Sequence, residues 1–173
     1  MAARLDPVAK QALSVGAATG AYGISFGALS VAAGLTVAQT MALSLLMFSG
    51  ASQFAVVAIV GAGGAGGAAV ATAAMLGVRN GLYGLQMSHV VGGRGLRRAV
   101  AAQLTIDEST AVALAQDDPR DARRGFWLTG AAVFAFWNLM TLVGALVGNA
   151  LGNPTTYGLD AAAAGAFCAL LWP

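Results

Sequence analysis

The sequence has few charged residues and almost none of the side chains from which catalytic and metal sites are built. Only 9% of its 173 residues are charged, and it has one cysteine, Cys168, and one histidine, His89. A single cysteine excludes an internal disulfide, and no cluster has metal-ligand spacing. No nucleophile with a matching base and no zinc motif is present, so we expect neither an enzyme nor a protein that needs a cofactor or a metal.

A nucleic-acid partner is not expected either. The net charge is only +2, and the basic residues lie in short stretches between apolar segments, without interleaved aromatic residues. The run 61–66 matches Gly-x-Gly-x-x-Gly, but no βαβ unit surrounds it, so it does not predict a dinucleotide site.

Apolar residues, in contrast, are abundant. They make up 58% of the chain, and the mean hydropathy is +0.74, well above what is typical of a soluble domain. Helix is the expected conformation, because only helices and closed barrels satisfy their backbone in lipid, and period-2 alternation is absent. We predict an all-α integral membrane protein with five to six apolar segments: 12–34, 38–60, 68–91, 99–116, 126–149 and the incomplete 160–173.

These segments form one predicted transmembrane domain over residues 1–173, which begins with a polar tail at 1–11. The last segment, 160–173, is too short to cross roughly 30 Å of hydrocarbon, which takes about 20 residues in a helix. We therefore expect the chain to be truncated at its C-terminus.

Charges inside two of the apolar segments are the main clue to function. Arg79 lies near the middle of 68–91, and Asp107 and Glu108 lie near the middle of 99–116. A charge at bilayer depth costs about 3 kcal/mol even on lenient scales, so it normally has a partner and a function. We predict that Arg79 pairs with one of the carboxylates at rest and binds a substrate carboxylate during transport. The alternative is a structural ion pair that holds two segments together.

The positions of the basic residues predict the topology. Arg94, Arg97 and Arg98 follow the third segment, and Arg120, Arg123 and Arg124 follow the fourth. The positive-inside rule places both clusters and the N-terminus in the cytoplasm. If the first two segments each span once, the third and fourth must both enter and leave on the cytoplasmic side. We therefore expect two re-entrant or broken segments that turn near Arg79 and Asp107, because paired interruptions mark the binding sites of many transporters.

Small residues in the first segment follow a regular spacing that indicates close helix packing. The stripe consists of Gly16, Gly20, Gly23, Gly27, Ser30 and Gly34. We interpret it as a contact face for another helix, with a backbone that unwinds beside a substrate near Gly23–Gly27 as the alternative. The pairs Gly77–Gly81 and Gly144–Gly148 repeat the Gly-x-x-x-Gly spacing and also indicate close packing.

A second polar group lies within the segment 38–60. Ser49, Ser52 and Gln53 share one face of a helix because they are three and four residues apart. They either form hydrogen bonds with another helix or line a pathway at a turn loosened by Gly50, and the spacing leaves both readings open.

Three runs resemble the AzlC-type branched-chain amino acid permeases, over residues from about 20 to the end. They are Phe48-Ser49-Gly50-Ala51-Ser52-Gln53-Phe54, Val78-Arg79-Asn80-Gly81-Leu82-Tyr83-Gly84 and Asp107-Glu108-Ser109. The family's usual Arg-His is Arg79-Asn80 here, so a role for that histidine does not carry over. The resemblance marks these residues for testing: Gly50, Ala51, Ser52, Gln53, Arg79, Tyr83, Asp107 and Glu108. Ser49 and Asn80 lie beside them and complete the predicted substrate path.

The resemblance implies export of branched-chain or other large neutral amino acids across the bacterial inner membrane. It also implies a small second membrane subunit of the AzlD type. We therefore expect a multi-pass secondary transporter that is the large subunit of a two-component system. The alternative is a membrane scaffold or assembly subunit that transports nothing, in which the buried ion pair is purely structural.

Overall fold

The structure, a computed structural model, describes residues 6–151, and every regular element in this range is an α-helix. The helices are α1 (Pro7–Ala21), α2 (Gly23–Ala32), α3 (Val37–Leu46), α4 (Gly50–Gly61), α5 (Gly66–Val91), α6 (Leu96–Gln103), α7 (Asp107–Leu114) and α8 (Pro119–Leu151). The predicted all-α class is confirmed for this part of the chain. The apolar segment 160–173 and the expected truncation lie outside the described residues.

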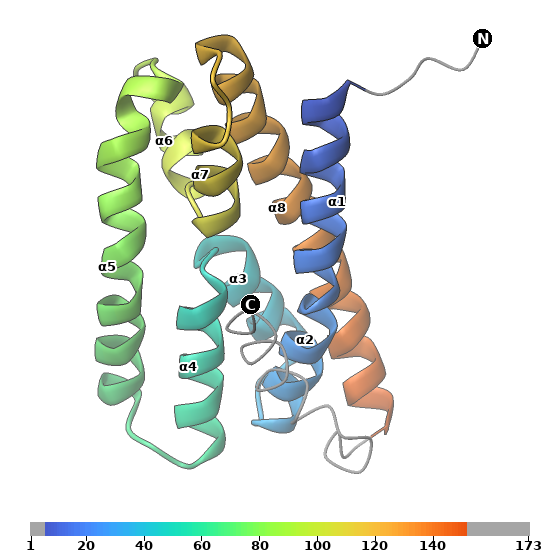
Figure 1. Ribbon diagram of the computed structural model, residues 1–173. Helices are drawn as coiled ribbons and strands as arrows, with labels where there is room; N and C mark the ends of the chain where they lie inside the picture. Colours follow the sequence, from blue (N-terminus) through green and yellow to red (C-terminus); the bar gives the residue numbers. More distant parts are fainter. Residues whose placement is uncertain (1–5, 152–173) are drawn as a thin grey trace, which may run out of the picture.

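The longest helix, α8, packs along its length against α1 and α2 (Figure 1). A Cβ atom on Gly16 would lie 2.7 Å from the Cβ atom of Ala132, and one on Gly27 would overlap the carbonyl oxygen of Thr141. The predicted close-packing face is therefore confirmed, and the seam leaves no room for side chains. Its other members are Gly20 and Gly23 on the N-terminal helices and Gly144 and Gly148 on α8.

Two other glycine predictions are not confirmed within the described residues. A Cβ atom on Gly77 would have one contact at 3.9 Å, and one on Gly81 would meet nothing within 4 Å among residues 6–151. This pair is therefore not a tight contact within the described chain. Gly34 does not extend the seam either; it has a φ of +92° and lies at the turn after α2.

Two helical stretches are long and apolar enough to cross a membrane, Pro7–Ala32 and Pro119–Ala150. The first is α1 and α2 taken together, since only Tyr22 separates them and its backbone stays helical. Its helix begins at Pro7, a residue suited to the first helical position, so the predicted polar tail 1–11 is partly helical. Val37–Leu46 and Gly50–Gly61 are apolar but shorter.

The fold contains two helical hairpins that enter from opposite ends. In Figure 1, α3 runs from the lower end to mid-height and α4 returns, while α6 descends from the upper end and α7 returns to it. The lower turns of the chain use glycines with positive φ, Gly34 before α3 and Gly63 after α4. The interruption predicted in 99–116 is confirmed, and it lies at residues 104–106, just before Asp107.

The interruption predicted in 68–91 is wrong, because α5 runs unbroken through Arg79, Asn80 and Gly81. Its 26 residues span about 39 Å at the rise of an α-helix. Arginine is a good helix former, and a glycine inside a helix costs only about 1 kcal/mol, so neither breaks the backbone. The charge of Arg79 is paired with a side chain from another helix, and no chain reversal occurs at this residue.

The segment 38–60, predicted to span once, is instead the second broken segment. The helical backbone ends at Met47, and Ser49 is extended, with φ −152° and ψ 99°. The turn lies directly before Gly50. A turn at Gly50 was one of the two interpretations of the polar group Ser49, Ser52 and Gln53. The number of interrupted segments was predicted correctly, but one of them was assigned to the wrong place.

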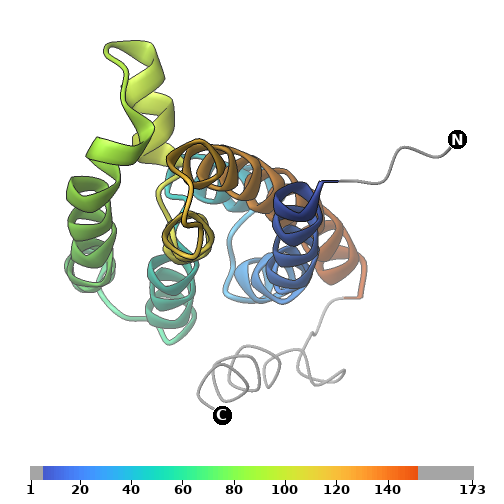
Figure 2. The same ribbon diagram turned by 45° about the horizontal axis from the view of Figure 1, so that its top comes forward.

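The basic clusters lie together at the upper end of the molecule, as predicted (Figure 1). Arg124 at the start of α8 pairs with Asp6 at 2.9 Å, and Arg123 donates from Nε to the Val90 carbonyl at the end of α5. We call this the arginine end; it comprises residues 6–10, 91–98 and 117–124. Figure 2 shows α5 at one edge of the molecule and α1 on the far side of α7.

Candidate functional site

The tips of the two hairpins meet at mid-height. The side chain of Gln103, the last residue of α6, donates from Nε2 to the carbonyl of Leu45 in the last turn of α3 at 2.8 Å. Carbonyls in the last turn of a helix have no partner within it, so the amide satisfies one of them. The contact places two helix C-termini, of α3 and α6, beside two helix N-termini, of α4 and α7.

An ion pair lies beside this junction. The Nη1 atom of Arg79, from the middle of α5, is 2.8 Å from Oδ2 of Asp107, the first residue of α7. Both side chains are about two-fifths exposed. Within residues 6–151, Arg79 Nε and Asp107 Oδ1 are buried and form no hydrogen bond. The pair therefore keeps one donor and one acceptor for a further ligand.

The two adjacent acids face different helices. Asp107 is directed to α5, whereas the half-buried side chain of Glu108 lies beside Thr19 of α1. On α5, the amide oxygen of Asn80 is buried without a hydrogen bond in the described range. Tyr83 is one turn from Arg79 and shares its face. The structure thus brings Arg79 and Asp107 together, with Asn80 next to Arg79 on α5 and Glu108 directed to α1.

The N-terminus of α4 lies at the same level and has no side-chain cap. Ser49 occupies the capping position, but its hydroxyl donates to Ser52 Oγ at 3.2 Å instead. Ser52 in turn donates to the carbonyl of Ala73 in α5 at 2.9 Å. The first N–H groups of a helix carry a partial positive charge, so the turn at Gly50 and Ala51 is suited to an anion.

Gln53 joins the two halves of the lower hairpin. Its side chain is fully buried and donates from Nε2 toward the carbonyls of Leu43 and Ser44, at 3.3 and 3.4 Å. Its Oε1 atom forms no hydrogen bond with any described residue. The structure therefore contains both features that the sequence left open, hydrogen bonds to neighbouring helices and a turn before Gly50.

An aromatic group beside the α4 N-terminus was not predicted. The rings of Phe26 and Trp137 stack with centroids 6.0 Å apart, and Phe54 meets both edge-on. The Trp137 ring would lie 3.4 Å from a Cβ atom on Gly50. Its indole nitrogen is buried without a hydrogen bond in residues 6–151. The only sequence signal was the large aromatic residue next to Asn138 in a seam of small residues.

The junction is fixed to α8 by a buried hydrogen bond. Ser44 donates to Asn138 Oδ1 at 2.8 Å, and Asn138 donates from Nδ2 to the Phe134 carbonyl at 2.8 Å. Polar side chains between apolar helices commonly serve this purpose. Asn138 is thus part of the support for the hairpin tip.

The groups at this junction match the chemistry of an amino acid. The α4 N-terminus and Arg79 attract a carboxylate, Asp107 and Glu108 attract an ammonium group, and the rings beside Gly50 offer apolar contacts. No group of three metal-ligating side chains occurs within the described range. The junction therefore combines groups that complement both charges and the apolar side chain of such a molecule.

A family model described as AzlC protein matches residues 14–151, which include both hairpins and every residue of the junction. No curated protein and no solved structure matches the chain. The matched family is membrane-associated and has a role related to branched-chain amino acid transport.

Proposed function

This chain belongs to the AzlC family, and we propose that it is a multi-pass transporter that exports branched-chain or other large neutral amino acids across the bacterial inner membrane. We further propose that it does so as the large subunit of a two-component system, with a small second membrane subunit of the AzlD type.

The observation that carries the proposal is the meeting of two half-helix hairpins at mid-height. Irregular backbone at the centre of a bilayer is tolerated where it is buried in protein or lines a cavity. Discontinuous helices whose ends converge near the midplane are how many secondary transporters build their substrate site. The Gln103–Leu45 hydrogen bond joins the two tips, and the Arg79–Asp107 ion pair joins the α6–α7 tip to α5, which supports a substrate site at this junction.

The substrate carboxylate binds at the uncapped N-terminus of α4 and at Arg79, whose free Nε remains available. The substrate ammonium binds at Asp107 or Glu108. Arg79 is then shared between Asp107 at rest and the substrate when it is bound, which couples occupancy to release of the α6–α7 hairpin from α5. The aliphatic side chain of the substrate packs against Trp137. A smaller or polar side chain would make poorer apolar contact with this ring.

The orientation follows from the arginine end. All charged side chains of residues 6–151, apart from the three at the junction, lie at this end, and the opposite end carries none. The positive-inside rule then places the arginine end in the cytoplasm. In this orientation, the α6–α7 hairpin is reached from the cytoplasm and the α3–α4 hairpin from the periplasm.

Support for a second subunit comes from the outer face of α5. Val70, Met75, Val78, Leu82 and Leu85 are each more than 60% exposed within the described residues. Gly81 and Gly84 have open space where a Cβ atom would be. A helix of the small subunit that packs here would use the shallow surface that these glycines leave.

The test is efflux of leucine from loaded cells and counterflow of labelled leucine in proteoliposomes. Arg79→Ala and Asp107→Asn are expected to abolish both, whereas Arg94→Ala, a matched removal of charge at an exposed position, leaves both near wild type. Wild-type counterflow in well-inserted Arg79→Ala protein would remove the ion pair from the mechanism.

A charge exchange separates transport from the scaffold alternative. If the pair is only structural, the double variant Arg79→Glu, Asp107→Arg restores whatever activity the single variants lose, because the ion pair is rebuilt with its ends exchanged. If Arg79 binds substrate, the double variant is stable but does not transport. Recovery of the complex with its partner, measured by co-purification, serves as the readout for the scaffold function.

A further inference from the structure

A pocket of ≈ 550 Å³ opens at the arginine end, between the last turn of α5 and the first turns of α8. It is lined by His89, Val90, Pro119, Arg120, Ala122, Arg123 and Arg124. It is distant from the junction of the hairpins, and the proposed transport mechanism makes no use of it. Three arginines and one histidine around one pocket make it suited to an anion.

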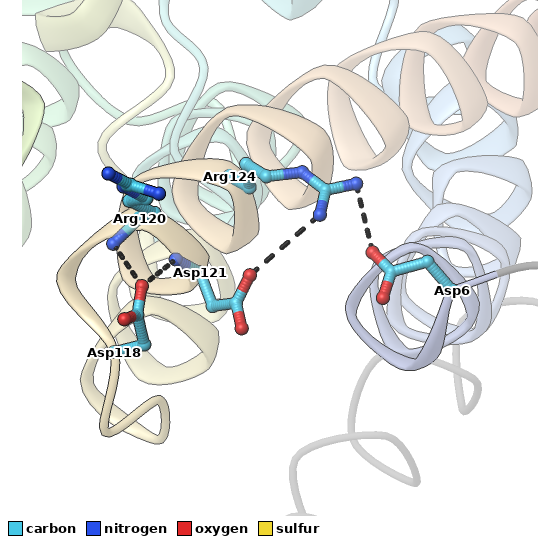
Figure 3. Close-up of polar contacts among 5 residues, drawn as sticks. All are labelled: Asp6, Asp118, Arg120, Asp121 and Arg124. Carbon is cyan, nitrogen blue, oxygen red and sulfur yellow. Dashed lines mark hydrogen bonds and ion pairs between the residues drawn. The ribbon is translucent and has the colours of Figure 1, made fainter.

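Two of these arginines have no acidic partner among residues 6–151. Arg123 donates from Nε to the Val90 carbonyl at 3.0 Å, which holds its guanidinium at the pocket wall, and no carboxylate of residues 6–151 pairs with it. Arg120 likewise forms no ion pair in this range. Figure 3 shows its guanidinium directed away from the carboxylates of Asp118 and Asp121. Arg124, in contrast, is neutralised by Asp6 at 2.9 Å.

The location of the pocket indicates the source of the anion. At the arginine end, seven basic residues face four acidic ones among the described residues, so the local charge is positive. One turn toward the centre of the molecule from the pocket residues, Leu128 on α8 presents a large exposed apolar side chain. A ligand that fits both features has an anionic head and an apolar tail.

We propose that this pocket binds the phosphate headgroup of an anionic phospholipid of the cytoplasmic leaflet, with Arg120 and Arg123 as its ligands. The proposal rests on the membrane orientation given under the proposed function. Basic pockets between helices at the cytoplasmic face are suited to lipid headgroups, and arginine binds phosphate through two parallel hydrogen bonds. Such a lipid would add a second polar link between the C-terminus of α5 and the N-terminus of α8, beside the hydrogen bond from Arg123 to the Val90 carbonyl.

The experiment measures binding of phosphatidylglycerol to the purified protein in neutral detergent by native mass spectrometry, with phosphatidylcholine as the comparison lipid. The test variant is Arg120→Gln, Arg123→Gln, and the matched control is Lys10→Gln, Arg94→Gln. The control removes the same charge from the same end but lies outside the pocket. The pocket variant is expected to bind phosphatidylglycerol about 20-fold more weakly, since each basic residue near an anionic lipid contributes roughly a fivefold factor. The control is expected to stay within about twofold of wild type.

Equal losses in the two variants would overturn the proposal, because they would show general attraction to a basic surface rather than a site. Displacement of the lipid by millimolar inorganic phosphate would also overturn it, because the site would then bind a soluble anion. Arg120 makes no side-chain hydrogen bond with the described residues, so Arg120→Gln alone gives a loss of about fivefold in a correctly folded protein if the double variant does not fold. No loss in that single variant also counts against the proposal.

Binding is measured without transport, so the two proposals fail separately. If the protein binds the lipid but does not transport leucine, the lipid site stands and the proposed function fails. If it transports leucine but shows no preference for phosphatidylglycerol, the proposed function stands and the lipid site fails.

Discussion

The side-chain amide of Gln103 donates a hydrogen bond to the main-chain carbonyl of Leu45 at 2.8 Å, joining two hairpins that enter from opposite ends. The two residues are 58 positions apart in the chain. The carbonyl belongs to the last turn of α3, where no backbone N–H of the helix can reach it. The contact therefore links the geometry of one hairpin tip directly to that of the other.

We predict that Gln103→Leu lowers the free energy of unfolding by about 1 kcal/mol, because the substitution removes one hydrogen bond and leaves the Leu45 carbonyl unpaired. It also lowers the rate of leucine counterflow, because the tips lose their register. The measurements are a thermal melt in detergent and counterflow in proteoliposomes. Gln86→Leu, at an exposed position of α5 for which no side-chain hydrogen bond is found in residues 6–151, is the control. Equal behaviour of the two variants would contradict the prediction.

The sequence predicted those features that depend on local composition or spacing. The glycine stripe of the first segment was recognisable because helical periodicity places its members on one face, and the structure seats Gly16 and Gly27 directly on α8. That Arg79 pairs with one of the two adjacent acids was predictable because an isolated charge in an apolar chain needs a partner, and the structure shows that this acid is Asp107. That the basic clusters lie at one end followed from the rule for topology.

Features that depend on contacts distant in sequence were not predictable in this way. The break at Met47 is stabilised by Gln103, from another helix, and by Gln53, from across the turn. The apolar sequence around Met47 is the same as would be expected of a continuous helix. The charge at Arg79 suggested a chain reversal, but a charge in a helix interrupts hydropathy and not the backbone. The only sequence signal for the Trp137 ring at the hairpin tip was its position next to Asn138, which does not predict a contact with Gly50.

Gln53 is expected to affect both stability and substrate affinity. Gln53→Leu leaves the carbonyls of Leu43 and Ser44 without their side-chain donor in a buried site, which we expect to cost about 2 kcal/mol. Gln53→Glu keeps the shape and the acceptor oxygens but loses the N–H donor, so it destabilises the protein at least as much. The quantities to measure are the melting temperature and the KM for leucine. A melting temperature unchanged in both variants would show that the amide does not hold the turn.

Gly27 and Gly81 are expected to respond in opposite ways to the same substitution. A Cβ atom on Gly27 overlaps the Thr141 carbonyl oxygen, so Gly27→Ala forces α2 away from α8 and costs about 3 kcal/mol. A Cβ atom on Gly81 meets nothing within the described chain, so Gly81→Ala stabilises α5 by about 1 kcal/mol through its helix propensity. Thermal melts of the purified chain alone measure both. If Gly81→Ala stabilises the chain alone but weakens co-purification with the proposed small subunit, that subunit packs on this face.

The hairpin arrangement predicts from which side of the membrane each loop is accessible to a labelling reagent. With Cys168 replaced by serine, Arg94→Cys and Asp117→Cys are expected to react with a membrane-impermeant maleimide only from the cytoplasm. Ala65→Cys, in the loop between α4 and α5, is expected to react only from the periplasm, because α3 and α4 form a hairpin and do not cross. If the segment 38–60 instead crossed once, Ala65→Cys would face the cytoplasm with the other two. Because Ala65 is exposed and carries no positive φ, the cysteine leaves the loop geometry unchanged. Labelling of Ala65→Cys from the cytoplasm therefore cannot be attributed to a distorted loop, and it would exclude the two-hairpin fold in the membrane.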